Sequence, residues 1–323
     1  MDEKGSQQLA EQPGKGHSGR VVLAVVAALI LFCAVVMVIH SRKPGHLTPE
    51  NVDSKVKGAY FIGVNQALIR QMADNWLPND LFWPTAFLDN IPSFQIGELE
   101  VVRYNLRVLR DNLTRMRTTD KLDPFAEAAF TALSNDPHKW WFPSAESKWS
   151  QGYRSLESFH QNLVVGKANF YPRADNLLEL ISQYVSLMGG ANTRLINAPR
   201  DIKDAVSLEE DRKGDSGTPS TVEVKIPWNR IDDNFYYAQG VAYALHESFR
   251  AIEVDFQAVL KDKNCIPLVR KILELLKRCD FEPLIIFNGD PDSIFANHSL
   301  NLSGVFNDAR QKMSSLIVAL MQG

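Results

Sequence analysis

Polar, charged and aromatic side chains recur at spacings of three and four residues between positions 236 and 257. On an α-helix these spacings stack side chains along one side, within reach of one another. A histidine in such a row can act as a general base, and an arginine beside it can bind an anion. We therefore regard His246 and Glu253 as candidate catalytic residues. The candidate binding residues of the row are Tyr236, Tyr243 and Arg250.

The same row also has a structural explanation. Arg250 and Glu253 are three residues apart, so they can form an ion pair on one helix. His246 would then pack at the boundary between core and solvent and take no part in catalysis. The residue types favour this structural explanation over a catalytic site.

Familiar catalytic and metal-binding motifs are absent from the sequence. His246-Glu247 begins like the zinc motif H-E-x-x-H, but position 250 is Arg, and arginine cannot ligate zinc. Cys265 and Cys279 have no C-x-x-C partner. The G-x-S-x-G elbow, the P-loop and the G-x-G-x-x-G loop are also missing. We predict no metal and no cofactor, and these absences favour a protein that is not an enzyme.

Four arginines accompany an apolar seam on the helix predicted for residues 97–117. The seam consists of Leu99, Val102, Leu106, Leu109, Leu113 and Met116, and the arginines are Arg103, Arg107, Arg110 and Arg117. Such a basic row could bind phosphate head groups, an acidic partner or acidic side chains of the same domain. The last explanation is favoured, because acids outnumber bases after residue 43.

Tryptophans gather in two short stretches, Trp76 with Trp83 and Trp140 with Trp141, and Trp149 follows. Three roles are open for them. They can be buried in the core, which is the favoured role, they can lie at a membrane interface, or they can stack on sugar rings. Because polar loops surround the second pair, Trp140 and Trp141 are included among the candidate binding residues.

The apolar residues follow helical periods along most of the chain. We predict a mainly α fold with at most one or two short strands. Gly189-Gly190 should close one helix, and Ser303 should cap the last. Helices are expected at 52–76, 97–117, 125–134, 147–165, 173–188, 233–260 and 267–278, and strands at 221–226 and 284–287. Cys265 and Cys279 flank a helix and should therefore lie too far apart for a disulfide.

One segment is long and apolar enough to cross a membrane. Residues 21–39 form an unbroken apolar run of 19 residues, followed by the basic stretch His40-Ser41-Arg42-Lys43. We therefore predict an uncleaved transmembrane helix at 21–39. A disordered tail is expected at 1–20, a tether at 40–50 and a helical soluble domain at 51–323, with an internal loop or domain boundary at 198–221.

Charge restricts the partners and leaves the orientation open. The net charge is −3, so no basic surface attracts nucleic acid, and we exclude nucleic-acid binding. Positive residues flank the apolar run on both sides, so the positive-inside rule is close to a tie. We expect the tail in the cytoplasm and the large domain in the periplasm, because single-span anchors with large C-terminal domains commonly run this way.

Three segments resemble a known protein family. They are IGELE at 96–100, WWFP at 140–143 and IPWNRIDDNFYY at 226–237. Together with the single apolar span, they resemble a proteobacterial family of membrane proteins catalogued as a domain of unknown function, number 2333. The resemblance covers nearly the whole chain. It implies a bacterial inner-membrane protein and carries over no activity, cofactor or catalytic residue.

These observations lead to one functional prediction and two rivals. We predict a non-enzymatic envelope protein, a tethered helical domain that binds other envelope proteins as a scaffold or assembly factor. The first rival is a tethered hydrolase of an envelope polymer such as peptidoglycan, using His246, Glu253 or the aspartate pairs at 232–233 and 290–292. The second is a binding module for glycans or lipid head groups, built on the tryptophans and arginines.

Overall fold

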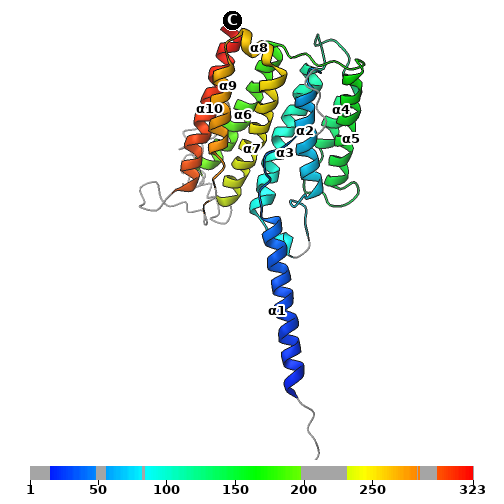
Figure 1. The fold of residues 1–323 in the computed structure, drawn as a ribbon, viewed down its shortest axis with the longest axis vertical. Helices are drawn as coiled ribbons and strands as arrows, with labels where there is room; N and C mark the ends of the chain where they lie inside the picture. The colour runs from blue at the N-terminus through cyan, green and yellow to red at the C-terminus, as the bar shows by residue number, and fades with distance from the viewer. Residues whose placement is uncertain are drawn as a thin grey trace, which may run out of the picture.

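The computed structural model describes residues 15–48, 56–81, 84–197, 231–281, 283 and 297–322. Every regular element within these residues is a helix, which confirms the mainly α fold. The helices form one bundle, and α1 (Lys15–His40) projects from one end of it (Figure 1). Both predicted strands and the predicted loop or boundary at 198–221 lie outside the described residues.

The helix α1 differs from every other helix in its surroundings. Its span Gly19–His40 is apolar and long enough to cross a membrane, and only 6% of its most apolar stretch is buried. A core helix of a soluble protein would be mostly buried, so α1 is not one. Its C-terminal end adjoins the bundle beside the short 3₁₀ helix η1 (Thr85–Phe87).

Two helices in the middle join the two sides of the bundle. α3 packs most extensively on α7, with α2, α4 and α5 on one side and α6, α9 and α10 on the other (Figure 1). The bounds are α2 Ala59–Asp74, α3 Asn90–Val108, η2 Leu109–Leu113, α4 Pro124–Leu133, α5 Ala145–Val164, α6 Ala174–Asn197, α7 Ile231–Asp255, α8 Gln257–Asp262, α9 Ile266–Arg278 and α10 His298–Gln322.

Two glycines allow the central helices to approach closely. A Cβ atom on Gly97 of α3 would collide with the Tyr237 carbonyl of α7. A Cβ atom on Gly240 of α7 would collide with the Phe94 carbonyl of α3. Any side chain at either position would push the helices apart, so the two glycines fix how α7 lies against the bundle.

The apolar seam predicted on residues 97–117 is confirmed for five of its six members, which are fully buried: Leu99, Val102, Leu106, Leu109 and Leu113. The prediction is wrong for Met116, whose side chain is 58% exposed. The helix turns into a π-helical segment at Leu109 and ends at Leu113, so the helical period does not extend to residue 116.

Several predicted helix ends are wrong, and the contacts at each end explain the difference. α6 does not stop at Gly189-Gly190 but continues to Asn197, because it packs along α10 there. Ser303 lies inside α10, which begins at His298, and the Asn297 side chain accepts from the Leu300 amide instead. The cap at Asp123 is confirmed, since its carboxylate accepts from two amides of the first turn of α4. Cys265 and Cys279 are both free and buried.

Candidate functional site

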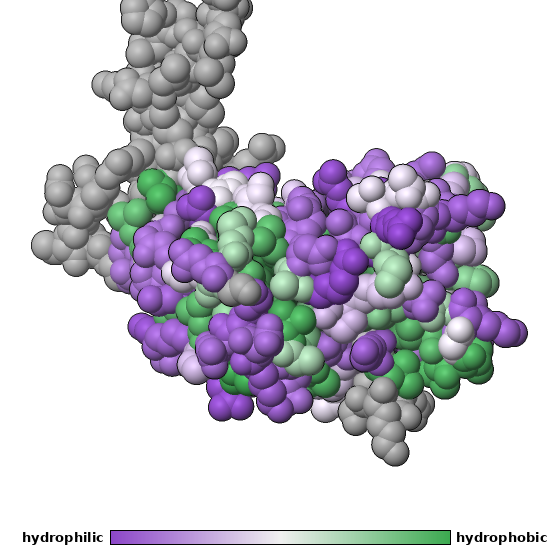
Figure 2. Space-filling model, turned by 90° about the horizontal axis from the view of Figure 1, so that it is seen from above, coloured by the Kyte–Doolittle hydropathy of each residue, from purple (hydrophilic) through white to green (hydrophobic). Residues whose placement is uncertain are grey.

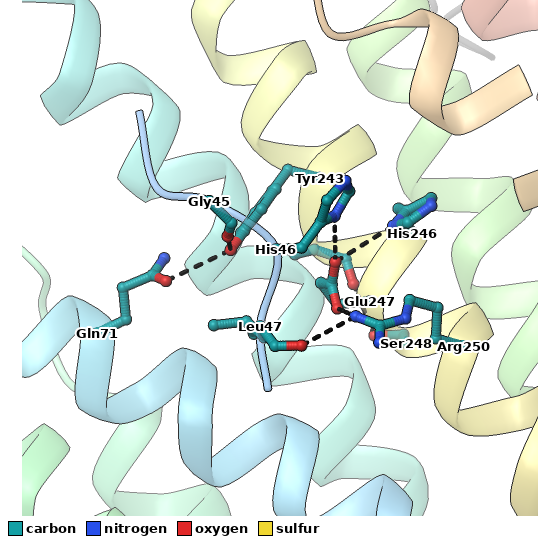
Figure 3. A network of polar contacts seen from close by, with 10 residues as sticks. Gly45, His46, Leu47, Gln71, Tyr243, His246, Glu247, Ser248 and Arg250 are labelled. Carbon is teal, nitrogen blue, oxygen red and sulfur yellow. Dashed lines mark hydrogen bonds and ion pairs between the residues drawn. The ribbon is translucent and has the colours of Figure 1, made fainter. Parts of the chain in front are cut away.

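A buried carboxylate on α7 is the centre of the polar site (Figure 3). Glu247 has no exposed surface, and its Oε1 lies 3.1 Å from Nδ1 of His46 and 3.2 Å from Nδ1 of His246. Its other oxygen, Oε2, accepts a hydrogen bond of 2.6 Å from Arg250. We call these four residues, His46, His246, Glu247 and Arg250, the clasp.

The clasp holds the segment that follows α1. Residues 41–47, which we call the strap, run in extended form alongside α7 (Figure 3). Tyr243 donates its hydroxyl proton to the Gly45 carbonyl at 2.7 Å, and Arg250 donates to the Leu47 carbonyl at 2.9 Å. His46 belongs to the strap itself. The predicted tether at 40–50 is therefore packed against the bundle at least over residues 41–47.

Two further contacts hold the junction between α1 and the strap. Nδ1 of His40, the last residue of α1, lies 2.7 Å from Oδ1 of Asn75, directly after α2. Lys43 pairs with Asp280 at 3.2 Å, and its ammonium lies 5.7 Å from the centre of the Tyr236 ring. The junction between α1 and the bundle therefore has defined contacts on both sides.

The charge state of Glu247 follows from its neighbours. Burial acts to raise the pKa of Glu247, but hydrogen bonds from His246 and His46 and the charge of Arg250 outweigh burial and lower it. The carboxylate is therefore ionised at neutral pH and can accept from all three side chains. Burial also raises the pKa of Tyr243, so its hydroxyl stays protonated and can donate to the strap.

A second buried carboxyl lies beside the clasp. The Tyr243 hydroxyl is 3.3 Å from Oε1 of Gln71, whose amide donates to Glu98 at 2.9 Å. Burial raises the pKa of Glu98 well above its ordinary value of 4.5, and the hydrogen bond from Gln71 only partly opposes this shift. Glu98 and Glu247 thus have opposite pKa shifts, because only Glu247 has an arginine and two histidines against it.

The structure brings together only part of the row that the sequence proposes on α7. Tyr243, His246 and Arg250 meet at the clasp and the strap. The predicted ion pair between Arg250 and Glu253 is wrong. Arg250 pairs with Glu247, and Glu253 accepts from Arg270 of α9 at 2.8 Å. The candidate catalytic residues His246 and Glu253 therefore bond to different partners.

The four arginines that the sequence places on one helix lie in α3, in η2 and after η2, in different surroundings. Arg103 donates to Glu100 and to the carbonyls of Leu133 and Asn135, so it caps the end of α4. Arg110 forms a bidentate pair with Asp111 and lies over the Phe130 ring. Arg107 and Arg117 are exposed. Two of the four arginines thus serve acids and carbonyls of this domain, as the favoured explanation expects.

The tryptophans are also divided. Trp76 and Trp149 are buried and pack edge to face, with ring centres 5.5 Å apart. Trp140 and Trp141 are exposed on the loop between α4 and α5. Trp83 lies outside the described residues. Core burial, the favoured role, therefore holds for the first two tryptophans and fails for Trp140 and Trp141.

Three residues of the site are missing from the row proposed on the sequence. Glu247 lies three residues before Arg250 and four after Tyr243, so helical spacing could have placed it with them. His46 and Gln71 lie on other segments of the chain. Nothing in one sequence indicates that the residue after Gly45 meets α7.

Two groups of side chains among the described residues could hold a metal ion. His46, His246 and Glu247 offer two imidazole nitrogens and one carboxylate oxygen within 4.8 Å of one another, a ligand set that suits zinc. Asp89, directly before α3, and Asp232 and Asp233, in the first turn of α7, offer three carboxylates. Arg250 already neutralises Glu247, so the first group is also stable as a set of hydrogen bonds.

Fold and site together define a class of protein, an all-α bundle clasped to the segment that follows a single apolar helix. The chain belongs to the family described as "Uncharacterized protein conserved in bacteria (DUF2333)", whose model matches residues 17–323. The resemblance to this family proposed on the sequence is thereby confirmed. No curated protein and no solved structure matches the sequence significantly.

Proposed function

We propose that this protein is a membrane-anchored scaffold of the bacterial envelope. In this proposal α1 spans the inner membrane, and the bundle binds other envelope proteins in the periplasm without catalysing a reaction. One observation carries the proposal: two of the binding residues that the sequence proposes on α7 are occupied by the strap of the same chain. Tyr243 and Arg250 are bonded to strap carbonyls, and Glu247 accepts from His46 of the strap.

The strap also supports an uncleaved anchor. Cleavage of a signal peptide leaves its apolar segment without any role in the mature fold. Here His40 at the end of α1 contacts Asn75, and Lys43 contacts Asp280. The His40 contact joins the end of the apolar helix directly to the bundle, and this connection supports an anchor that stays part of the mature protein.

A second candidate function is the tethered hydrolase, and one observation favours it. The hydrogen-bond distances from Glu247 to His46 and His246, 3.1 and 3.2 Å, resemble the spacing of zinc ligands. Zinc bonds of about 2.0–2.1 Å place tetrahedral ligand atoms roughly 3.3 Å apart. A zinc ion there could activate water at an open position. Against this, the Arg250 guanidinium bonds the same carboxylate and would repel a cation.

The experiment uses the full chain in lipid nanodiscs. A scaffold releases no soluble fragments from peptidoglycan, with or without added Zn²⁺, and cross-linking in cells traps a stoichiometric envelope protein on the bundle. If the wild type releases fragments and the variants His246→Ala and His46→Ala do not, the scaffold proposal is overturned in favour of the hydrolase. Reporters fused after Gly323, one active only outside the cytoplasm and one only inside, test the side of the membrane.

A further inference from the structure

The loop between α4 and α5 exposes three consecutive aromatic side chains, which we call the aromatic loop. Trp140 is 47% exposed, Trp141 61% and Phe142 86%. Their rings pack edge to face, with centres 4.8 Å apart in the first pair and 5.8 Å apart in the second. Adjacent exposed aromatic residues on a folded protein indicate an interaction surface.

Hydrogen bonds hold the aromatic loop on the bundle. Nε1 of Trp76 donates to the Pro137 carbonyl at 2.8 Å, and the Ala145 amide donates to the Lys139 carbonyl at 2.7 Å. The Asn79 side chain also donates to the Lys139 carbonyl, at 3.3 Å. The backbone on both sides of the three aromatics is therefore fixed, and their rings stay outside the core.

The aromatic loop lies at the end of the bundle from which α1 projects (Figure 1). Trp76, which binds the loop, directly follows Asn75, which contacts His40 at the end of α1. Two more apolar side chains are exposed in the segment between α2 and α3, Leu81 at 56% and Phe87 at 68%. Phe87 belongs to η1, which adjoins α1. Exposed apolar side chains thus occur both in the loop and beside the anchor.

The opposite end of the bundle has a different surface. Figure 2 views that end, where hydrophilic residues cover most of the surface and hydrophobic patches lie between them. Val164 and Val165, at the end of α5, are exposed there and are aliphatic. Tryptophan favours the interface between lipid and water, since its ring is apolar and its N–H can bind head groups.

We infer that the aromatic loop inserts into the head-group region of the same bilayer that α1 spans, as a second membrane contact of the bundle. The inference rests on the proposed anchoring by α1. Because α1 ends beside Asn75, the lipid surface would begin at the level of the loop. Two separate contacts, a spanning helix and an interfacial loop, would fix the tilt of the bundle on the membrane.

The test uses the full chain in nanodiscs whose lipids carry bromine either near the head groups or deep in the acyl chains. Bromine quenches the fluorescence of nearby tryptophan. The fluorescence of the loop is the difference in tryptophan fluorescence between the wild type and the double variant Trp140→Phe/Trp141→Phe. Both positions are exposed, so we expect them to tolerate the change. We expect the shallow bromine to quench this signal at least about twofold more than the deep bromine. Val164→Trp, made in the double variant, is the control at the far end and should not be quenched.

Different failures point to different parts of the account. A chain that does not co-elute with nanodiscs contradicts the anchoring by α1, and the inference falls with it. A chain that co-elutes while the signal from residues 140 and 141 is unquenched overturns the inference alone. A change in the same signal on adding soluble peptidoglycan fragments, without lipid quenching, would also overturn it and assign the loop to glycan.

Discussion

Two polar networks that include residues of α7 differ in the segments that they join. Deep in the bundle, the Asn105 amide donates to Asn65 and to Ser248, and its oxygen accepts from the Tyr184 hydroxyl. This network is buried, carries no charge and joins four helices. The clasp contains the ion pair of Glu247 with Arg250, and His46 is 60% exposed at its side chain. The first network determines the fold, whereas the second determines where the strap lies.

The comparison predicts that the two networks fail in different ways. Loss of the Asn105 network should destabilise the whole bundle, because its four side chains are buried and water cannot replace the bonds that Asn105 makes to the other three. Loss of the clasp should free the strap while the bundle stays folded, because water can reach His46 and Arg250. The predictions below run from the largest expected effect to the smallest.

Asn105→Ala should give the largest loss of stability. It removes the common partner of Asn65, Ser248 and Tyr184 and leaves buried polar groups unpaired, at a cost of about 4 kcal/mol. Urea unfolding followed by circular dichroism measures the free energy of unfolding. A loss below about 1 kcal/mol, or a freed strap in a bundle of unchanged stability, would contradict the division between the networks.

Asp255 offers a test at the far end of α7, where its carboxylate accepts from the amides of Gly58 and Phe61 at the start of α2. Burial raises the pKa of Asp255 from 3.8 to about 6, and the hydrogen bonds from these amides only partly oppose the shift. The pKa of Asp255 is higher in the folded protein than in the unfolded chain. Its contribution to the free energy of unfolding is therefore complete below pH 3.8 and is lost as the pH rises through about 6.

We therefore expect the contribution of Asp255 to fall by roughly 2 to 3 kcal/mol between pH 4 and pH 7. Asp255→Asn keeps one acceptor and cannot ionise, so its free energy of unfolding should change less over this range. Unfolding in urea at several pH values measures both proteins. Equal pH dependence of the variant and the wild type would show that Asp255 does not titrate in this window.

Glu247→Ala should free the strap at a smaller cost in stability. The change leaves Arg250 without its carboxylate and removes the acceptor of His46 and His246, which we expect to lower stability by about 2 kcal/mol. Trypsin cleavage after Arg42 should accelerate, because the strap no longer lies along α7. Cleavage at the wild-type rate would indicate that other contacts suffice to hold the strap.

Acid should weaken the hold of Glu247 on the strap in the same way as the alanine substitution. The folded pKa of Glu247 lies below its ordinary value of 4.5, so its stabilisation is present above pH 4.5 and is lost as the pH falls through the folded pKa. The mobility of a spin label on Gly45→Cys, recorded directly at each pH, should therefore increase only well below pH 4.5. Glu247→Gln should remove this dependence on pH.

Glu253→Ala should have the smallest effect. Glu253 pairs with Arg270, whose side chain is 71% exposed, and exposed ion pairs contribute about 0.5 kcal/mol or less. We expect the strap to stay in place and the midpoint of unfolding to move little. Strap release in this variant, comparable to that of Glu247→Ala, would restore the row proposed on the sequence as one functional unit.

The sequence predicts well what depends on local pattern. The apolar seam from Leu99 to Leu113, the cap at Asp123 and the apolar helix before the bundle all follow from spacing and residue type. The sequence predicts poorly what depends on packing between distant segments. α6 continues through Gly189-Gly190 because it lies along α10, and no pattern near the glycines indicates this neighbour.

The site was predicted in part for the same reason. Helical spacing correctly groups His246 and Arg250, since both lie on one helix. It cannot distinguish Glu247 from Glu253 as the partner of Arg250, because each lies three residues from it. That choice depends on His46, which folding brings from a segment some 200 positions away, and on Arg270 of α9.

The central claim is that the clasp holds the strap, and the mobility of the strap tests it most directly. A Cβ atom at Gly45 would meet open space, so Gly45→Cys can carry a spin label after the three native cysteines are replaced by alanine. We predict a slow, ordered spectrum for the full chain in nanodiscs and a mobile one in Glu247→Ala, while a label at Val254→Cys on α7 is unchanged. A label at position 45 that is equally mobile in both proteins would contradict the account.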